Sequence, residues 1–103
     1  MARKLLETAL AADPKLPEAQ FQMGRFLQDD SLWKESIPFL ERAVELKPDY
    51  ATAHYRLARA YWRTGRKKDG DAQIELQKKF SRQEQEDMDR RMRQIQILVV
   101  NIH

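Results

Sequence analysis

The chain has 103 residues, of which 42% are hydrophobic, and its 19 Lys/Arg against 16 Asp/Glu give a net charge of +3. This length suits one domain with a modest core. The lack of cysteine excludes disulfides, thiolate catalysis and cysteine zinc sites, and the sequence has no secretory signal and no apolar run of 18 residues that could span a membrane. We expect neither a structural metal nor a cofactor.

The charge is unevenly distributed along the chain. Residues 1–50 hold 7 Lys/Arg and 9 Asp/Glu, a net charge of −2, whereas residues 51–103 hold 12 and 7, a net charge of +5. Between Arg56 and Lys68 there are six basic residues and no acidic one. This basic segment favours an acidic partner through Coulomb attraction, which salt screens beyond about 8 Å.

The first expected helix, residues 3–12, ends at Asp13-Pro14. Two more are expected at 17–29 and 33–46, joined by a polar turn that ends at Ser31, because their apolar residues recur at helical spacings. Pro17 opens its helix, where a missing N–H is tolerated. Pro38 forbids a bond to the carbonyl four residues back, so its helix is expected to begin regularly only near residues 33–35.

A second hairpin is expected from helices at 51–63 and 67–79. Gly65 lies in its turn, where glycine accepts the left-handed conformation that ends a helix. His54 occupies a packing position of the first helix and is interpreted as a core residue.

The two hairpins repeat with a period of 34 residues and no insertion, which pairs Pro14 with Pro48 and Ala9 with Ala43. Small residues recur where the paired helices would touch, at Gly24 and at Ala58. This pattern resembles the tetratricopeptide repeat, a helix–turn–helix unit of 34 residues. The second helices of the two repeats depart from the family pattern at three positions. Ser36 and Gly70 stand where the family has a small Ala, and Leu40 and Ile74 stand where it has Phe. Arg82 stands where the second repeat would have its closing proline.

The resemblance implies an all-α, right-handed α-solenoid of antiparallel helix hairpins. Residues 1–80 are divided into a half repeat (1–16) and two full repeats (17–50 and 51–80). A solenoid unit cannot bury its apolar face alone, so the half repeat predicts a piece of a longer array. A natural N-terminal helix is the alternative.

Residues 81–103 are expected to form a C-terminal capping or oligomerisation helix that starts near Arg82. From Asp71 onward there is neither Gly nor Pro, so one continuous helix competes with a break near Ser81. The sequence Ser81-Arg82-Gln83-Glu84 has the form of a capping box, which favours the break.

In the family that the sequence resembles, first helices line a concave groove that binds peptides. Arg25 stands where the family's carboxylate-clamp pattern has an asparagine, so a clamp is not expected. Arginine still binds carboxylates in a bidentate manner, and Tyr, Trp and Arg are enriched in binding hot spots. The predicted groove residues are Phe21, Arg25, Gln28, Tyr55, Arg56, Arg59, Trp62 and Arg63.

We also expect self-association, most simply as a two-fold dimer. The first helix lacks its hairpin partner, and the C-terminal segment carries a heptad-like apolar stripe that requires a partner surface. The residues predicted for this contact are Leu5, Leu6, Met92, Ile95, Leu98, Val99 and Ile102.

The sequence shows no catalytic constellation, because it lacks a nucleophile with a suitably spaced histidine, a glycine-rich phosphate loop and a metal-ligand cluster. We therefore predict a non-enzymatic protein-interaction module that binds an acidic or amphipathic peptide. The alternatives are nucleic-acid binding through the segment from Arg56 to Lys68, with Tyr55 and Trp62 for stacking, and a purely structural oligomerisation element.

Overall fold

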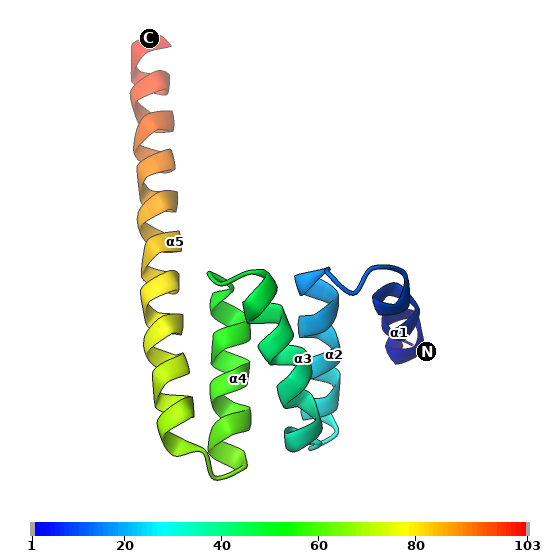
Figure 1. Ribbon diagram of the computed structural model, residues 1–103. Helices are drawn as coiled ribbons and strands as arrows, with labels where there is room; N and C mark the ends of the chain where they lie inside the picture. Colours follow the sequence, from blue (N-terminus) through cyan, green and yellow to red (C-terminus); the bar gives the residue numbers. More distant parts are fainter. Residues whose placement is uncertain (1, 103) are drawn as a thin grey trace.

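The computed structural model describes residues 2–102, with the side chains of residues 2, 3 and 102 outside the description. All regular secondary structure in this range is helical and is arranged as an α-solenoid (Figure 1). The elements are α1 (Ala2–Ala12), α2 (Pro17–Asp29), α3 (Trp33–Leu46), α4 (Ala51–Arg63) and α5 (Lys67–Ile102).

The bounds of the first four helices confirm the sequence prediction to within one residue, because local signals fix them. Pro17 occupies the first turn of α2, where its missing N–H costs no hydrogen bond. The segment Lys47-Pro48 ends α3, since the residue before a proline is disfavoured in the helical conformation.

The two hairpin turns have the same backbone geometry one period apart. Ser31 (φ 62°) and Gly65 (φ 84°) are both left-handed. In each turn the next amide, Leu32 or Arg66, donates to a carbonyl five residues back, at 2.8 and 2.7 Å. These bonds satisfy carbonyls that the helix end would leave unpaired.

Replacing Ser31 with glycine is expected to stabilise the protein by about 0.5–1 kcal/mol. The left-handed conformation costs a side-chain-bearing residue about 1–2 kcal/mol, and the greater freedom of glycine in the unfolded chain offsets part of that gain. Urea denaturation measures the change, with Gly65→Ser as the reciprocal variant. A loss of stability in Ser31→Gly, or none in Gly65→Ser, would contradict this account of the turns.

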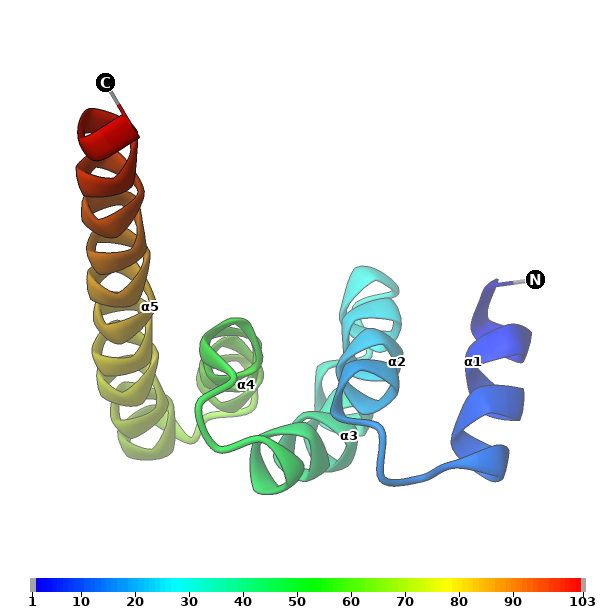
Figure 2. The same cartoon turned by 90° about the horizontal axis from the view of Figure 1, so that it is seen from above.

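Helices α2 and α4 form one layer and α3 lies in the other, as Figure 2 shows from above. The core runs between these layers because α2 and α4 each turn one apolar face towards α3. The buried cluster consists of Phe21, Ile37, Leu40, Ala43, Ala53, Leu57, Ala60 and Tyr61.

Small residues lie at the closest helix contacts, as the period predicted. A Cβ on Gly24 would come within 2.6 Å of the Cγ of Leu40, and one on Gly70 would come within 2.5 Å of the Trp62 ring. Ala58 is fully buried beside Gly70, with its carbonyl oxygen 3.0 Å from the same added Cβ. Larger side chains at these positions would push the helices apart.

Gly24→Ala is therefore expected to lower the free energy of unfolding by about 0–2 kcal/mol, although alanine usually favours a helix by about 1 kcal/mol over glycine. Overpacking a fully buried leucine costs about 1–3 kcal/mol. Ala72→Gly, at an exposed position of α5, serves as a control that measures the difference in helix propensity between alanine and glycine without overpacking. A Gly24→Ala variant more stable than the parent would show that α2 and α3 can separate freely.

The predicted break near Ser81 is wrong, because α5 continues without interruption from Lys67 to Ile102. The capping box does not form; instead the Ser81 hydroxyl accepts a hydrogen bond from Nε2 of Gln77 at 3.0 Å, one turn earlier in the same helix. With Arg82 in place of the proline that closes the earlier repeat, nothing removes a helical hydrogen bond there.

The expectation that a separate helix from about residue 82 caps the array is also wrong. Residues 82–101 are exposed, and this part of α5 projects beyond the other helices (Figure 1). Only the first part of α5 packs on α4. The predicted division into residues 1–80 and 81–103 therefore does not coincide with a helix boundary.

Candidate functional site

The outer side of α4 carries four large side chains that point away from the core. Tyr55 and Trp62 are 43% and 41% exposed, Arg63 is exposed and Arg59 is half-buried. They recur at spacings of three and four residues, which places them along one side of a helix. We call Tyr55, Arg59, Trp62 and Arg63 the α4 face.

The two arginines of the α4 face rest on aromatic rings. The Cζ atom of Arg59 lies 5.4 Å from the ring centre of Trp33 and 5.9 Å from that of Tyr55, and the Cζ atom of Arg63 lies 5.0 Å from the Trp33 ring. The ring quadrupole attracts the guanidinium at these distances. Trp33, at the start of α3, thus positions two cations of α4.

Among the residues that the structure describes, neither Arg59 nor Arg63 has a carboxylate partner or a hydrogen bond from its guanidinium. Other arginines behave differently: Arg42 pairs with Glu45 at 3.0 Å and Arg66 with Asp69 at 2.8 Å. The guanidinium donors of Arg59 and Arg63 are therefore free to bind an anionic group.

Arg56 lies at the boundary between α4 and α2. Its carbonyl oxygen accepts a 2.8 Å hydrogen bond from Nε2 of Gln28, and its Nη1 donates to Oε1 of the same side chain at 3.4 Å. Gln28 is only 4% exposed. It joins the two helices and cannot present its side chain to a ligand, so its assignment to the groove is wrong.

Phe21 is also misassigned, because it is 7% exposed and belongs to the core cluster. Tyr50 packs on it, with ring centres 5.1 Å apart. One period later Tyr55 remains open, since Glu84 stands where a second Tyr50 would be and α5 continues as a helix instead of turning back. Of the predicted groove residues, Phe21 and Gln28 are thus buried and four form the α4 face, whereas Arg25 and Arg56 belong to neither group.

Arg25, one period before Arg59, is half-buried on α2. Its Cζ atom is 5.5 Å from the Phe26 ring centre, and its Nε atom is buried without a hydrogen-bond partner in the described part of the chain.

Trp62 marks the edge of the α4 face that adjoins α5. Its Nε1 donates to Oδ1 of Asp71 at 3.1 Å, and its ring covers Gly70. The indole therefore has a fixed orientation while 41% of its surface remains exposed.

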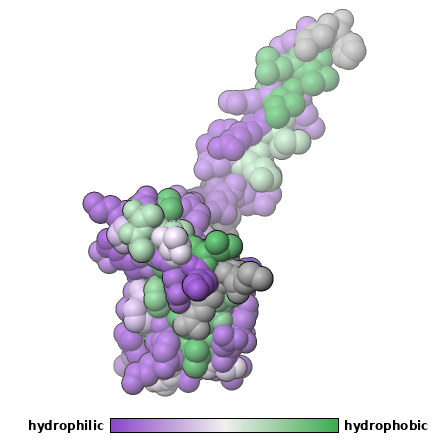
Figure 3. Space-filling view, turned by 90° about the vertical axis from the view of Figure 1, so that its right-hand side faces the viewer, coloured by the Kyte–Doolittle hydropathy of each residue, from purple (hydrophilic) through white to green (hydrophobic). Residues whose placement is uncertain are grey.

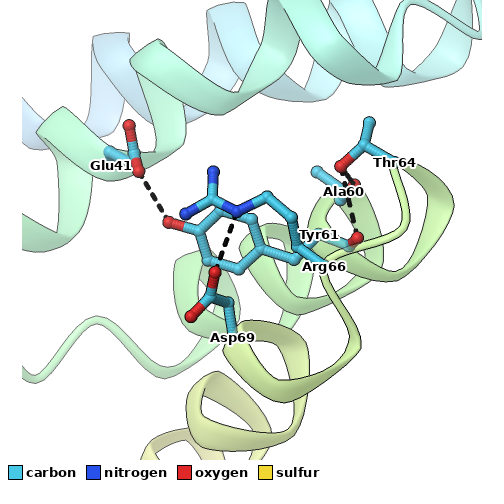
Figure 4. Close-up of polar contacts among 6 residues, drawn as sticks. All are labelled: Glu41, Ala60, Tyr61, Thr64, Arg66 and Asp69. Carbon is cyan, nitrogen blue, oxygen red and sulfur yellow. Dashed lines mark hydrogen bonds and ion pairs between the residues drawn. The ribbon is translucent and has the colours of Figure 1, made fainter.

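A polar cluster fixes α4 against α3 and the turn into α5, as Figure 4 shows. The Tyr61 hydroxyl donates to Oε2 of Glu41 at 2.6 Å. The Arg66 guanidinium lies 4.2 Å from the Tyr61 ring centre and pairs with Asp69. Thr64 closes the turn by donating to the carbonyl of Ala60 at 2.8 Å.

Burial raises the pKa of Tyr61 well above its usual value, and the hydrogen bond to Glu41 raises it further. The native state therefore favours neutral tyrosine. Stability from this preference is complete below about pH 10, where tyrosine in the unfolded chain titrates, and is lost as the pH rises towards the native pKa.

We expect the free energy of unfolding to fall above pH 10, and to fall less steeply in Tyr61→Phe. Urea denaturation across this range tests the slope, with Tyr55→Phe as control; an unchanged slope in Tyr61→Phe would contradict the assignment.

His54 is buried, as expected for a packing position. Its Nδ1 lies 2.6 Å from Oε1 of Gln73 and its Nε2 lies 2.7 Å from the carbonyl oxygen of Pro48. Its ring stacks on Phe80, with centres 5.6 Å apart. These contacts join α4 to α5 and leave no ring nitrogen free for a substrate.

The residues predicted for self-association lie at opposite ends of the solenoid (Figure 1). In α1, Leu5 is 72% exposed and Leu6 is half-buried. The side chain of Ile102 lies outside the described residues. The other predicted residues are 50–62% exposed on α5: Met92, Ile95, Leu98 and Val99.

Within residues 2–102, no group of three or more His, Asp or Glu side chains is arranged to hold a metal ion. No helix in this part of the chain is both long enough and apolar enough to cross a membrane.

Comparison with known proteins gives the fold a family context. Residues 33–65, from the start of α3 to the turn after α4, match the family model described as TPR repeat. No curated protein sequence matches the chain.

Solved structures of MamA have a similar fold. MamA AMB-1 is 22% identical with a TM-score of 0.72, over 79% of this chain and 44% of that one. The structure described as the crystal structure of MamA is 16% identical with a TM-score of 0.76, over 82% and 50% of the two chains. The MamA RS-1 ArsTM double mutant is 23% identical with a TM-score of 0.74, over 81% and 47%. This chain thus matches about half the length of each structure. The protein is a tetratricopeptide-like helical solenoid, the kind of scaffold that serves protein–protein interaction, with a TPR repeat at residues 33–65.

Proposed function

We propose that this protein is a non-enzymatic interaction module that binds an acidic peptide on the α4 face. The observation that carries the proposal is the state of Arg59 and Arg63: both guanidiniums lie over the Trp33 ring, and neither pairs with a carboxylate in the described part of the chain. Two fixed cations without counter-charges constitute a binding surface for anions.

The chemistry of the guanidinium favours a carboxylate ligand. A planar arginine that stacks on a ring keeps its N–H donors at the edge, where they can form two parallel hydrogen bonds to one carboxylate. Because the Trp33 ring restricts the side chain, less conformational entropy is lost when the ligand binds. Tyr55 and Trp62 add exposed aromatic surface for apolar side chains of the same peptide.

Nucleic acid is the second candidate, and the ion pairs weaken it. The segment from Arg56 to Lys68 is strongly basic in sequence, but Arg66 is paired with Asp69, and Asp71 lies against Trp62. A polyanion would meet these carboxylates next to the aromatic ring on which a base would stack.

A third possibility is that Tyr55 and Trp62 pack against another helical hairpin. Their equivalents one period earlier, Phe21 and Gln28, are covered by the following repeat. Such a contact would be mainly apolar, so it would depend little on acidic residues in the ligand.

The experiment is a peptide-library screen followed by titration calorimetry. The strongest acidic peptides are remade with Asn and Gln in place of Asp and Glu, and each pair is measured at low and physiological salt. We expect the amide versions to bind at least about tenfold more weakly, since each lost charge-assisted hydrogen bond is worth about 1.5–3 kcal/mol. Equal affinity of the two versions would reject the carboxylate ligand and favour the hairpin contact. Tighter binding of single-stranded DNA, with a steep salt dependence, would favour the nucleic-acid interpretation.

A further inference from the structure

The second half of α5 is a free-standing helix with an apolar side. Residues 82–101 are exposed, and Figure 3 shows hydrophobic atoms gathered towards the far end of the projecting helix. Met88, Met92, Ile95 and Val99 are 60%, 54%, 51% and 50% exposed. We call residues 82–102 the α5 tail and these four residues its seam. Side chains of this kind are normally covered by a partner.

The four seam residues define one register for a two-fold pair. They follow one another at intervals of four, three and four residues, which places their midpoint between Arg93 and Gln94, and Ile102 continues the spacing by three residues. A two-fold axis at this midpoint would bring Met88 opposite the partner's Val99 and Met92 opposite the partner's Ile95. Alternating intervals of three and four are the spacing of coiled-coil seams.

The charges of the α5 tail distinguish a parallel from an antiparallel pair of helices. Glu84, Glu86, Asp87 and Asp89 form an acidic band, and Arg90, Arg91 and Arg93 form a basic band directly after it. A parallel pair in register would place each band against an identical band, which is unfavourable for like charges. An antiparallel pair about the midpoint separates the two acidic bands to opposite ends of the overlap, where each lies beside uncharged residues of the partner, and only the two basic bands lie near each other, at the axis.

The length of the α5 tail also fits the antiparallel arrangement. The overlap about this midpoint runs from residue 85 to residue 102, which is about 27 Å of helix. It stops before Phe80 and Ser81, the last half-buried residues of α5. The partner helix therefore occupies only the part of α5 that the solenoid leaves uncovered.

We infer that the α5 tail binds the α5 tail of a second copy of this chain as an antiparallel two-helix pair with its two-fold axis between Arg93 and Gln94. The contact is isologous, so it closes after two chains and leaves both α4 faces open. It is also short, about two and a half heptads, so the dimer dissociates on dilution. Because the α4 face takes no part in it, this inference is independent of the proposed function.

The association is tested by sedimentation equilibrium on the full chain over a concentration series. We expect a reversible monomer–dimer equilibrium. Ile95→Glu places an unpaired charge in the seam and is expected to weaken the dimer by more than about a hundredfold. The matched control Gln83→Glu adds the same charge at an exposed position of α5 that lies before the overlap, and should leave the equilibrium nearly unchanged. A monomer at all concentrations, or a dimer that Leu5→Glu in α1 abolishes and Ile95→Glu does not, would overturn the inference.

The direction is tested by oxidation of single-cysteine variants, since the natural chain contains no cysteine. In the antiparallel pair Met88→Cys lies beside Val99→Cys of the other copy, and the two Met88 positions are about 16 Å apart along the axis, too far for a disulfide. We expect a covalent dimer from the mixture of the two variants and little from either alone. Rapid cross-linking of Met88→Cys with itself would show a parallel pair and reject the proposed geometry.

Discussion

Replacing Leu40 with alanine is expected to lower the free energy of unfolding by about 2–5 kcal/mol, the range for large-to-small substitutions at buried sites. Leu40 is fully buried, belongs to the core cluster and lies against Gly24 at the closest approach of α2 and α3. The backbone of α2 is already in contact with it, so the helices can fill little of the resulting cavity. Small domains have only about 5–15 kcal/mol in total, so much of the stability would be lost.

Urea denaturation of Leu40→Ala alongside Leu5→Ala measures this effect. Leu5 is 72% exposed, and the same substitution there should change stability by no more than about 0.5 kcal/mol. Combining Leu40→Ala with Gly24→Ala should cost less than the sum of the two single changes, because the added methyl group enters the space that the leucine vacates. Equal losses at Leu40 and Leu5 would show that α3 is rotated from the orientation described above.

The helices and their pairing could be predicted from the sequence because local and periodic signals agree. Pro17, Pro48 and Gly65 mark helix ends, and the 34-residue period means that each helix assignment can be checked against the equivalent segment of the other repeat. The period also placed Gly24 and Ala58 at helix contacts, where the structure has them.

The continuous α5 could not be predicted, because the capping box at Ser81 is a local pattern that competes with helix propagation. Without a Gly or Pro between Asp71 and Ile102, each residue gains an intrahelical hydrogen bond, and Ser81 instead accepts from Gln77 within the helix. The serine side chain can serve either structure, so the motif alone does not decide between them.

The α4 face was predicted in part, and the errors come from assuming that every repeat has the same neighbours. Tyr55 and Phe21 are equivalent by the period, but only Phe21 is covered, by Tyr50 and the core cluster. The role of Trp33 under Arg59 and Arg63 was missed. Contacts between residues 26 and 30 positions apart leave no local signal in a single sequence.

The double variant Arg59→Glu/Arg63→Glu is expected to bind the acidic peptide selected in the screen at least about 30-fold more weakly, equivalent to about 2 kcal/mol. It removes the two guanidiniums that lack carboxylate partners in the described chain and sets two negative charges against the ligand. Titration calorimetry with this peptide measures the change, and thermal unfolding checks that the solenoid persists.

The matched control is Lys34→Glu/Arg42→Glu, which changes the net charge by the same amount on the outer side of α3. A general Coulomb effect would weaken binding equally in both double variants, whereas a specific site requires a much larger loss in the first. If Arg59→Glu/Arg63→Glu leaves the affinity within about twofold of the parent, the α4 face is not the binding site.

Arg59→Lys separates the geometry of the guanidinium from its charge. Lysine keeps the positive charge but loses the planar group that lies near the rings of Trp33 and Tyr55 and that can bind a carboxylate with two hydrogen bonds. We expect this variant to lose about tenfold in affinity, less than the charge reversal, because one charge-assisted hydrogen bond is worth about 1.5–3 kcal/mol and the ammonium replaces part of it. Full affinity in Arg59→Lys would mean that the α4 face attracts its ligand by charge alone, without the bidentate contact that the stacked guanidinium offers.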